Sequence, residues 1–181
     1  MQGKGAATLT LIVQHSLGHR PYWSYSFRRV QQFDSALAVL DRGLVTVTDK
    51  ETLSAEKLDT LRVAGRAEEA VALGRRLISQ SYSGPQIWVK LAQTFQDQGK
   101  LPEAIDTLEQ GLKSNPNDED LREKLASIFA DNDAPQHAAL HYKWLTDQFP
   151  KKASYPALLA NMYLELEFYD RAMYWYRGNV P

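Results

Sequence analysis

Apolar residues recur along this chain at the three- and four-residue spacing of an amphipathic helix. Within residues 85–118, Trp88, Leu91 and Phe95 fall on one helical face, with polar residues between them. A second helical pattern follows Gly99, a residue type that readily adopts the left-handed backbone conformation that ends a helix. The pattern therefore predicts two amphipathic helices joined by a tight turn.

The same pattern recurs along the chain with a fixed period of about 34 residues. Small residues hold one column of this repeat, at Ala36, Ala70, Ala104, Ala138 and Ala172. Bulky residues hold a second column in the same register, at Phe27, Leu61, Phe95, Phe129 and Tyr163. A hairpin of this length cannot bury its apolar face alone, so a fixed period predicts stacked hairpins that share a continuous core. We expect the alanines where helices approach closely, and the bulky residues in the space between layers.

Residues 85–118 resemble the tetratricopeptide repeat, a family of helical hairpins with this period. The matching residues are Trp88, Leu91, Ala92, Phe95, Gly99, Ala104, Leu108 and Pro116. The resemblance extends over nearly the whole chain. It implies an all-α fold, a right-handed α-solenoid of about five helical hairpins.

Extending the register in both directions gives the expected domain organisation. Residues 1–16 are expected to form either a partial helix, the remnant of a preceding repeat, or a frayed tail. Five repeats are then expected, over residues 17–50, 51–84, 85–118, 119–152 and 153–181, and the first of them is degenerate. No polar capping element is visible in the last repeat, so we expect it to be uncapped.

The composition excludes several kinds of functional site. The chain has 181 residues and a formal net charge of −1, so no global field attracts it to nucleic acid or to anionic lipid. It has no cysteine, which excludes disulfides, thiolate zinc sites and cysteine nucleophiles. No apolar run approaches the roughly 18–20 residues that span a bilayer, and no signal peptide is evident. The sequence leaves the compartment open between cytoplasm and periplasm.

In this family the first helices of successive repeats line a concave groove, so the resemblance implies that partner-binding residues lie on those helices. Transferred onto this sequence, they are Tyr22, Tyr25, Arg28, Arg29, Glu56, Asp59, Arg62, Val89, Lys90, Gln93, Gln96, Asp97, Lys124, Ser127, Asp131, Leu158, Asn161 and Glu165. The competing interpretation is that these residues are simply solvated. It fits Tyr22 and Tyr25 least well, because exposed aromatics beside Arg28 and Arg29 have a composition typical of binding hot spots.

Candidate chemical sites are few. His137 and His141 lie four residues apart on one predicted helix, with Asp133 one turn earlier, a spacing able to bind a divalent ion. No second carboxylate is close in sequence, so we interpret the histidines as part of a solvated surface and expect no metal site. No Gly-rich phosphate loop, serine elbow or paired-carboxylate arrangement stands out, and we expect neither a cofactor nor catalysis.

The sequence therefore favours a non-catalytic scaffold that binds a peptide or helix of a partner protein in its groove. The linkers at residues 115–118 and 149–152 resemble those of bacterial members that serve secretion, pilus or polysaccharide-export machinery. Two alternatives remain: a structural spacer that acts through its stacking faces in a longer repeat array, and a non-catalytic part of a larger enzyme. The uncapped end also predicts self-association, through an apolar face formed by Leu166, Phe168, Tyr169, Met173 and Tyr176.

Overall fold

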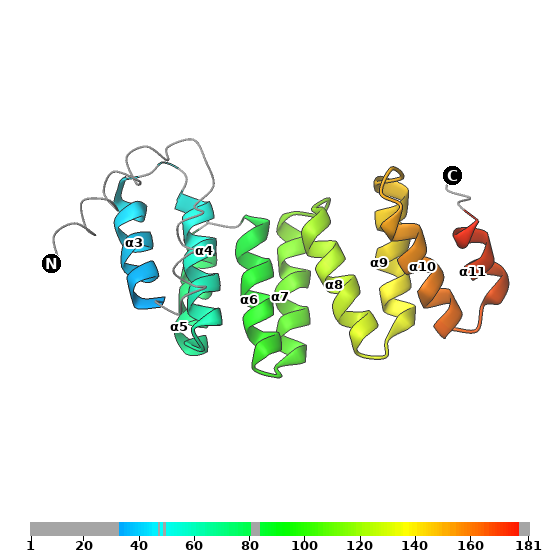
Figure 1. Cartoon of the computed structure of the whole chain (residues 1–181), viewed down its shortest axis with the longest axis horizontal. Coiled ribbons are helices and arrows are strands. Elements are labelled where there is room, and N and C mark those ends of the chain that lie inside the picture. The colour runs from blue at the N-terminus through cyan, green and yellow to red at the C-terminus, as the bar shows by residue number, and fades with distance from the viewer. Residues whose placement is uncertain (1–32, 47, 49, 81–83, 178–181) are drawn as a thin grey trace, which may run out of the picture. The chain divides into compact units, whose positions relative to one another are not determined.

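The computed structural model describes residues 33–177, except residues 47, 49 and 81–83. Every regular element in this part of the chain is an α-helix. In chain order the helices are α3 (Phe33–Thr46), α4 (Lys50–Val63), α5 (Ala67–Ser79), α6 (Pro85–Asp97), α7 (Leu101–Ser114), α8 (Glu119–Asp131), α9 (Pro135–Gln148), α10 (Ser154–Glu165) and α11 (Tyr169–Tyr176) (Figure 1). The expected all-α solenoid of helical hairpins is confirmed, whereas its right-handed sense stays a prediction.

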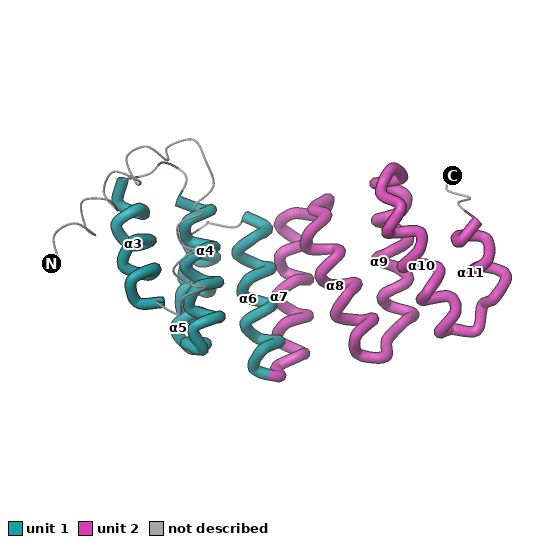
Figure 2. Tube along the Cα trace, in the orientation of Figure 1, with its two compact units in different colours: residues 1–98 teal, residues 99–181 magenta. Residues whose placement is uncertain are grey.

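Contacts divide the chain into two compact units, which we call unit 1 (residues 1–98) and unit 2 (residues 99–181) (Figure 2). In unit 1, α4 packs against α3, α5 and α6, and α5 also packs against α6. In unit 2, each helix packs against the next one, from α7 to α11. Each element thus contacts only near neighbours in the chain, which is the packing expected of stacked hairpins. None of the described helices is both long and apolar enough to cross a bilayer.

The alanine column lies where helices meet. All five members are fully buried, with 0% of their surface exposed: Ala36, Ala70, Ala104, Ala138 and Ala172. Of the bulky column, Leu61 and Phe95 are buried and Phe129 and Tyr163 are half-buried, while Phe27 lies outside the described residues. The register inferred from the sequence is therefore the register of the core.

Local sequence explains where several helices begin. Pro85, Pro102 and Pro135 each occupy the first turn of a helix, where a backbone N–H would have no intrahelical partner. The Asp118 carboxylate caps α8, because it accepts a hydrogen bond from the backbone N–H of Leu121 at 2.9 Å.

In each of the four hairpins whose turn the structure describes, one residue at the same column has a left-handed backbone conformation. Gly65 and Gly99 have φ values of 75° and 72°, as expected for glycine after the end of a helix. Asp133 and Glu167 occupy the same column in the next two repeats and have φ values of 53° and 60°. The sequence does not predict these left-handed conformations. The hairpin geometry therefore overrides residue preference there, at a cost of about 1–2 kcal/mol for a side chain that carries a Cβ atom.

A backbone hydrogen bond accompanies this turn. The N–H of the residue after the left-handed position donates to the carbonyl of the bulky column in three hairpins: Arg66 to Leu61 (2.9 Å), Ala134 to Phe129 (3.0 Å) and Phe168 to Tyr163 (2.8 Å). This bond satisfies a carbonyl that the end of the helix would leave unpaired. The bulky column thus has a backbone role besides its packing role.

The first prediction concerns the alanine column. Ala138→Leu should lower the free energy of unfolding by about 1–3 kcal/mol, because the site between α8 and α9 has no room for three further carbons. Chemical denaturation followed by circular dichroism measures the change. Ala157→Leu on the exposed face of α10 is the matched control and should change stability by no more than about 0.5 kcal/mol. Equal effects of the two substitutions would contradict the close approach.

The second prediction concerns the left-handed column. Glu167→Gly should raise the free energy of unfolding by about 0.5–1 kcal/mol, because the relief of backbone strain exceeds the added entropy of the unfolded chain. The same substitution at Glu109, in the exposed middle of α7, should instead lower it by about 1 kcal/mol. Denaturation curves of the two variants should therefore shift in opposite directions, and a shift in the same direction would show that Glu167 is not strained.

Candidate functional site

The first helices of two successive repeats, α4 and α6, pack against each other in unit 1. They carry eight of the residues that the sequence places in the binding set: Glu56, Asp59, Arg62, Val89, Lys90, Gln93, Gln96 and Asp97. On α4, Leu58 and Leu61 point into the core, which leaves the intervening polar positions beside α6. We call this surface the first-helix face.

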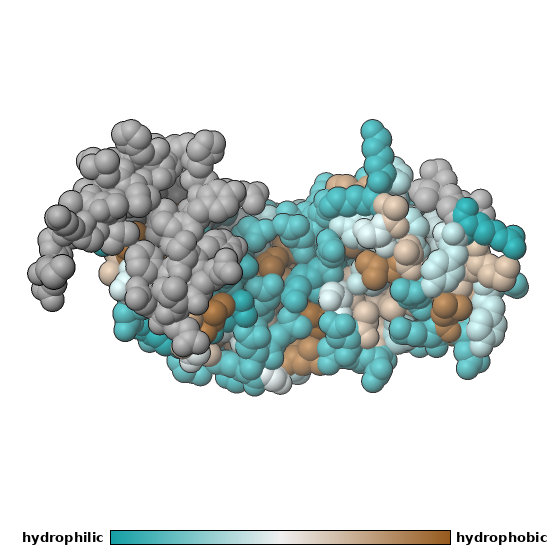
Figure 3. All heavy atoms as spheres, in the orientation of Figure 1, coloured by the Kyte–Doolittle hydropathy of each residue, from teal (hydrophilic) through white to brown (hydrophobic). Residues whose placement is uncertain are grey.

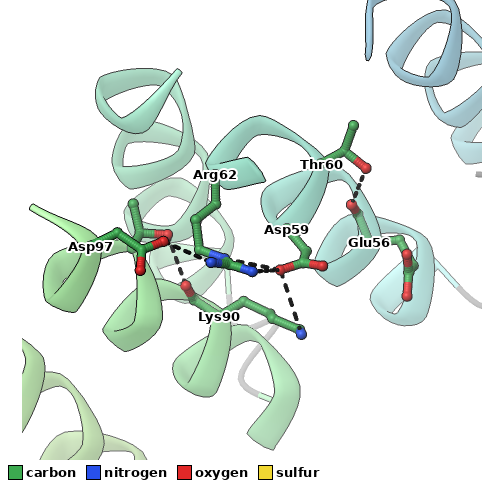
Figure 4. A network of polar contacts seen from close by, with 7 residues as sticks. Glu56, Asp59, Thr60, Arg62, Lys90 and Asp97 are labelled. Carbon is green, nitrogen blue, oxygen red and sulfur yellow. Dashed lines mark hydrogen bonds and ion pairs between the residues drawn. The ribbon is translucent and has the colours of Figure 1, made fainter. Parts of the chain in front are cut away.

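Four charged side chains form a network across the first-helix face (Figure 4). The Asp59 Oδ1 atom accepts hydrogen bonds from Arg62 Nε at 3.0 Å and Arg62 Nη2 at 2.8 Å. Lys90 Nζ lies 3.5 Å from the same oxygen. The third Arg62 donor, Nη1, bonds Asp97 Oδ2 at 2.7 Å. Two opposite-charge pairs, Arg62–Asp97 and Lys90–Asp59, thus join α4 to α6.

Burial makes this network more than a surface salt bridge. Asp59 is only 6% exposed, whereas the Asp97 side chain is 54% exposed. Burial alone would lower the pKa of Arg62, but its hydrogen bonds to Asp97 and Asp59 outweigh that effect and raise it. The four charges sum to zero, so each buried charge has an opposite partner. Removal of Asp59 alone would leave two cations, Arg62 and Lys90, with one carboxylate, Asp97.

Gln93 lies beside this network, one repeat period after Asp59 and at the same position of its repeat. Its Oε1 atom is buried and accepts no hydrogen bond within the described part of the chain. A buried amide oxygen without a donor costs about 1–3 kcal/mol, so the site would gain from any donor brought to it. Val89, one turn earlier, is 8% exposed and offers little surface to a partner.

In unit 2 the expected residues lie on α8 and α10 but form no comparable network. They are half-buried or exposed: Lys124, Ser127, Asp131, Leu158, Asn161 and Glu165. Ser127 Oγ donates to Asp131 Oδ2 at 3.3 Å within α8. Asn161 Oδ1 accepts a hydrogen bond from the Tyr176 hydroxyl of α11. The structure therefore brings the predicted residues of unit 1 together more closely than those of unit 2.

A different set of residues ties α8 to the start of the next hairpin. The Tyr155 hydroxyl lies between Glu119 and Glu123, at hydrogen-bond distance from both, and Lys152 pairs with Glu119. Burial and these two carboxylates raise the pKa of Tyr155. Burial would raise the pKa of Glu119, but its bonds to Lys152 and Tyr155 lower it. These contacts fix the stacking of successive repeats.

The solvated histidine surface expected in the fourth repeat is wrong for His141. Phe129 stacks on His137 with a centroid distance of 5.0 Å and on His141 at 5.7 Å, so both imidazoles cover an aromatic ring. His141 is half-buried, and its Nδ1 atom has no partner among the described residues. Burial, followed by the charges of Arg122 and His137, lowers the pKa of His141 to about 4.

Next to this stack, the Arg122 guanidinium lies over the Trp144 ring at 3.9 Å from its centroid. Arg122 Nη2 donates to the Pro116 carbonyl at 2.8 Å. Within the described residues, no group of three or more histidine and carboxylate side chains is arranged to hold a metal ion. The aromatic and cationic residues of this hairpin serve packing between α8 and α9.

Part of the predicted binding set lies outside the described residues. It comprises Tyr22, Tyr25, Arg28 and Arg29. What sequence reasoning missed is the pairing across the first-helix face. A signal was present, because Arg62 and Asp97 are opposite charges 35 residues apart, close to one repeat period.

The fold and the first-helix face define the class of protein: an α-helical repeat protein with a polar face built from successive first helices. Residues 61–128 match the family model described as tetratricopeptide repeat. Residues 61–128 are thus similar to the tetratricopeptide repeat, and the hairpin fold of the described helices agrees with that similarity. In a comparison with curated protein sequences, none matches the chain.

Solved structures show the same fold at low sequence identity. A crystal structure of MamA has a TM-score of 0.66 and 15% identity, over 86% of this chain and 91% of that chain. YrrB, described as a TPR protein with an unusual peptide-binding site, has a TM-score of 0.59 and 17% identity, over 93% of this chain and 88% of that chain. At these identities the likeness shows the fold alone.

The third prediction concerns pH. Because the native state holds the pKa of His141 near 4 and the unfolded chain holds it near 6.5, the unfolded state binds more protons between these values. The free energy of unfolding should therefore fall as the pH drops from 6.5 to 4. We expect His141 to contribute about 1–2 kcal/mol of that fall, less than the full shift implies, because solvent screens part of the ring.

Denaturation at pH 7, 5.5 and 4 measures this loss. His141→Phe keeps a ring against Phe129 and should flatten the pH dependence, whereas His137→Phe is the matched control and should keep it. Identical slopes for wild type and His141→Phe would refute the assignment.

Proposed function

We propose that this chain is a non-catalytic interaction scaffold that holds a peptide or a helix of a partner protein against its first-helix face. The observation that carries the proposal is the charge network of Asp59, Arg62, Lys90 and Asp97 between α4 and α6. The tetratricopeptide repeat fold supports it, because a fold neighbour, YrrB, is described as having a peptide-binding site.

The network prepares this face for binding in two ways. Arg62 and Lys90 are already held by carboxylates, so a partner that contacts them immobilises less side-chain freedom than it would on free cations. Their charges are also neutralised by Asp59 and Asp97, so the face carries only the formal charge of −1 from Glu56, too little to select a strongly acidic or basic partner. A polar peptide backbone suits such a surface.

Gln93 adds an acceptor to this face. Its buried Oε1 lacks a donor within the described residues, and a backbone N–H of an extended peptide would supply one. Gln96 is half-buried and Asp97 is exposed one turn further along α6, where they extend the polar surface. We propose the complete predicted set, including its members on α8 and α10, as the partner-binding residues.

As the biological setting we propose a bacterial secretion, pilus or polysaccharide-export assembly, on the resemblance of the two linkers noted above. The alternative is a spacer that acts through its stacking faces, or a non-catalytic part of a larger enzyme. Such a spacer would not require the first-helix face to be free, so binding at that face separates the two functions.

The fourth prediction tests the face directly. Peptides are selected from a displayed random library on the full chain, and the best of them is synthesised with a fluorescent label for polarisation titrations. Gln93→Arg with Gln96→Arg adds bulk and charge on the first-helix face and should raise the Kd of the selected peptide at least about tenfold, equivalent to about 1.4 kcal/mol.

Gln136→Arg with Gln148→Arg is the matched control, because it adds the same two charges at exposed positions of the second helix α9. This control should leave the Kd unchanged. Equal Kd values for both double variants, or a library that yields no binder, would overturn the proposed function.

A further inference from the structure

One face of the last described helix carries exposed apolar and aromatic residues. Tyr169, Met173 and Tyr176 follow one another at four- and three-residue spacing and are 60%, 49% and 50% exposed. On the same helix, Ala172 and Trp175 are buried. In Figure 3, pale and brown side chains gather over α10 and α11. We call the three exposed residues the α11 stripe.

The equivalent stripe one repeat earlier is covered. Ala139 and Tyr142 of α9 precede Met173 and Tyr176 by one repeat period, and they are only 7% and 4% exposed. Helices α8 and α10 both pack on α9, whereas α11 has α10 as its main described neighbour. Within the described residues no helix packs on α11 in the same way. The α11 stripe is thus a stacking surface without a described occupant.

The charges that border the stripe indicate which occupant fits it. Asp170 and Arg177 lie seven residues apart on one side of α11, a separation of about 10.5 Å. Both are exposed, and none of the ion pairs among the described residues includes either of them. The neighbouring Arg171 is engaged differently, because its guanidinium lies 5.2 Å from the Phe168 ring centroid and 5.7 Å from that of Tyr163. Asp170 and Arg177 therefore remain available for an intermolecular partner.

We propose that two copies of this chain pair through the α11 stripe, with the two α11 helices antiparallel about a two-fold axis near Met173. Met173 lies midway between Asp170 and Arg177, so antiparallel pairing places Asp170 of each copy beside Arg177 of the other. Tyr169 of each copy then lies near Tyr176 of the other. Parallel pairing would instead place like charges together. This charge pattern is self-complementary, as a two-fold interface requires.

The interface is small, which sets the expected affinity. One helix of eight residues buries less than the roughly 800 Å² per partner of a standard stable interface. The dimer should therefore be weak, with a Kd on the order of tens to hundreds of micromolar. It is independent of peptide binding at the first-helix face, and either proposal can fail without the other.

Sedimentation equilibrium of the full chain from about 5 to 500 μM tests the pairing. The wild-type chain should pass from monomer to dimer in this range. Asp170→Arg alone and Arg177→Asp alone each set two pairs of like charges against each other and should raise the Kd at least tenfold. A strictly monomeric wild-type chain would overturn the proposal.

Two further samples make the test specific for antiparallel pairing. The double variant, Asp170→Arg with Arg177→Asp, exchanges the charges and should recover the wild-type Kd. An equimolar mixture of the two single variants should form a heterodimer, because all its charge pairs are opposite. Asp106→Arg, an exposed reversal on α7, is the matched control and should leave the Kd unchanged. A wild-type dimer that neither Asp170→Arg alone nor Arg177→Asp alone weakens would place the interface elsewhere and refute the pairing.

Discussion

The structure depends on one packing constraint, the close approach of helices at the alanine column. Each of the five alanines is fully buried, and a larger side chain at any of them would push two helices apart. Because the constraint recurs once in every repeat, the helices within each compact unit pack in a similar way. The left-handed turn follows from it, since the chain must reverse within a few residues to bring the second helix back to the same contact. Asp133 and Glu167 accept strained backbone conformations there because the hairpin cannot form otherwise.

The period also organises the polar contacts. Many of the hydrogen bonds and ion pairs that join successive repeats connect residues 30 to 36 positions apart. When two helices stack in register, a side chain lies beside its counterpart one period away. Opposite charges at that separation are therefore close enough to form an ion pair. On the first-helix face this gives the network of Asp59, Arg62, Lys90 and Asp97. The same rule joins Glu119 to Lys152 in unit 2.

Whether the sequence predicts a feature of this structure depends on how far apart in the chain the interacting residues lie. The hairpins, the alanine column and the turns at Gly65 and Gly99 depend on residues within one repeat, and the sequence predicts them correctly. The burial of Asp59 and the stacking of His141 on Phe129 depend on side chains from another helix. Periodicity alone gives no rotamer, so it could not tell a solvated histidine from one that covers an aromatic ring. The candidate site was thus predicted as a set of positions but not as a network.

The α11 stripe contacts the predicted binding set at one side chain. Tyr176 belongs to the α11 stripe, and its hydroxyl donates to Asn161 on α10, which belongs to the predicted binding set. Asn161 occupies the same position of its repeat as Asp59, Gln93 and Ser127. A contact that reorients Tyr176 would therefore break or strengthen its hydrogen bond to the Asn161 side chain. Linkage between two sites is reciprocal, so a partner that engages Asn161 would change the pairing affinity by the same factor by which pairing changes partner affinity. With only one hydrogen bond between the surfaces, that factor should be small, and the two surfaces should act nearly independently.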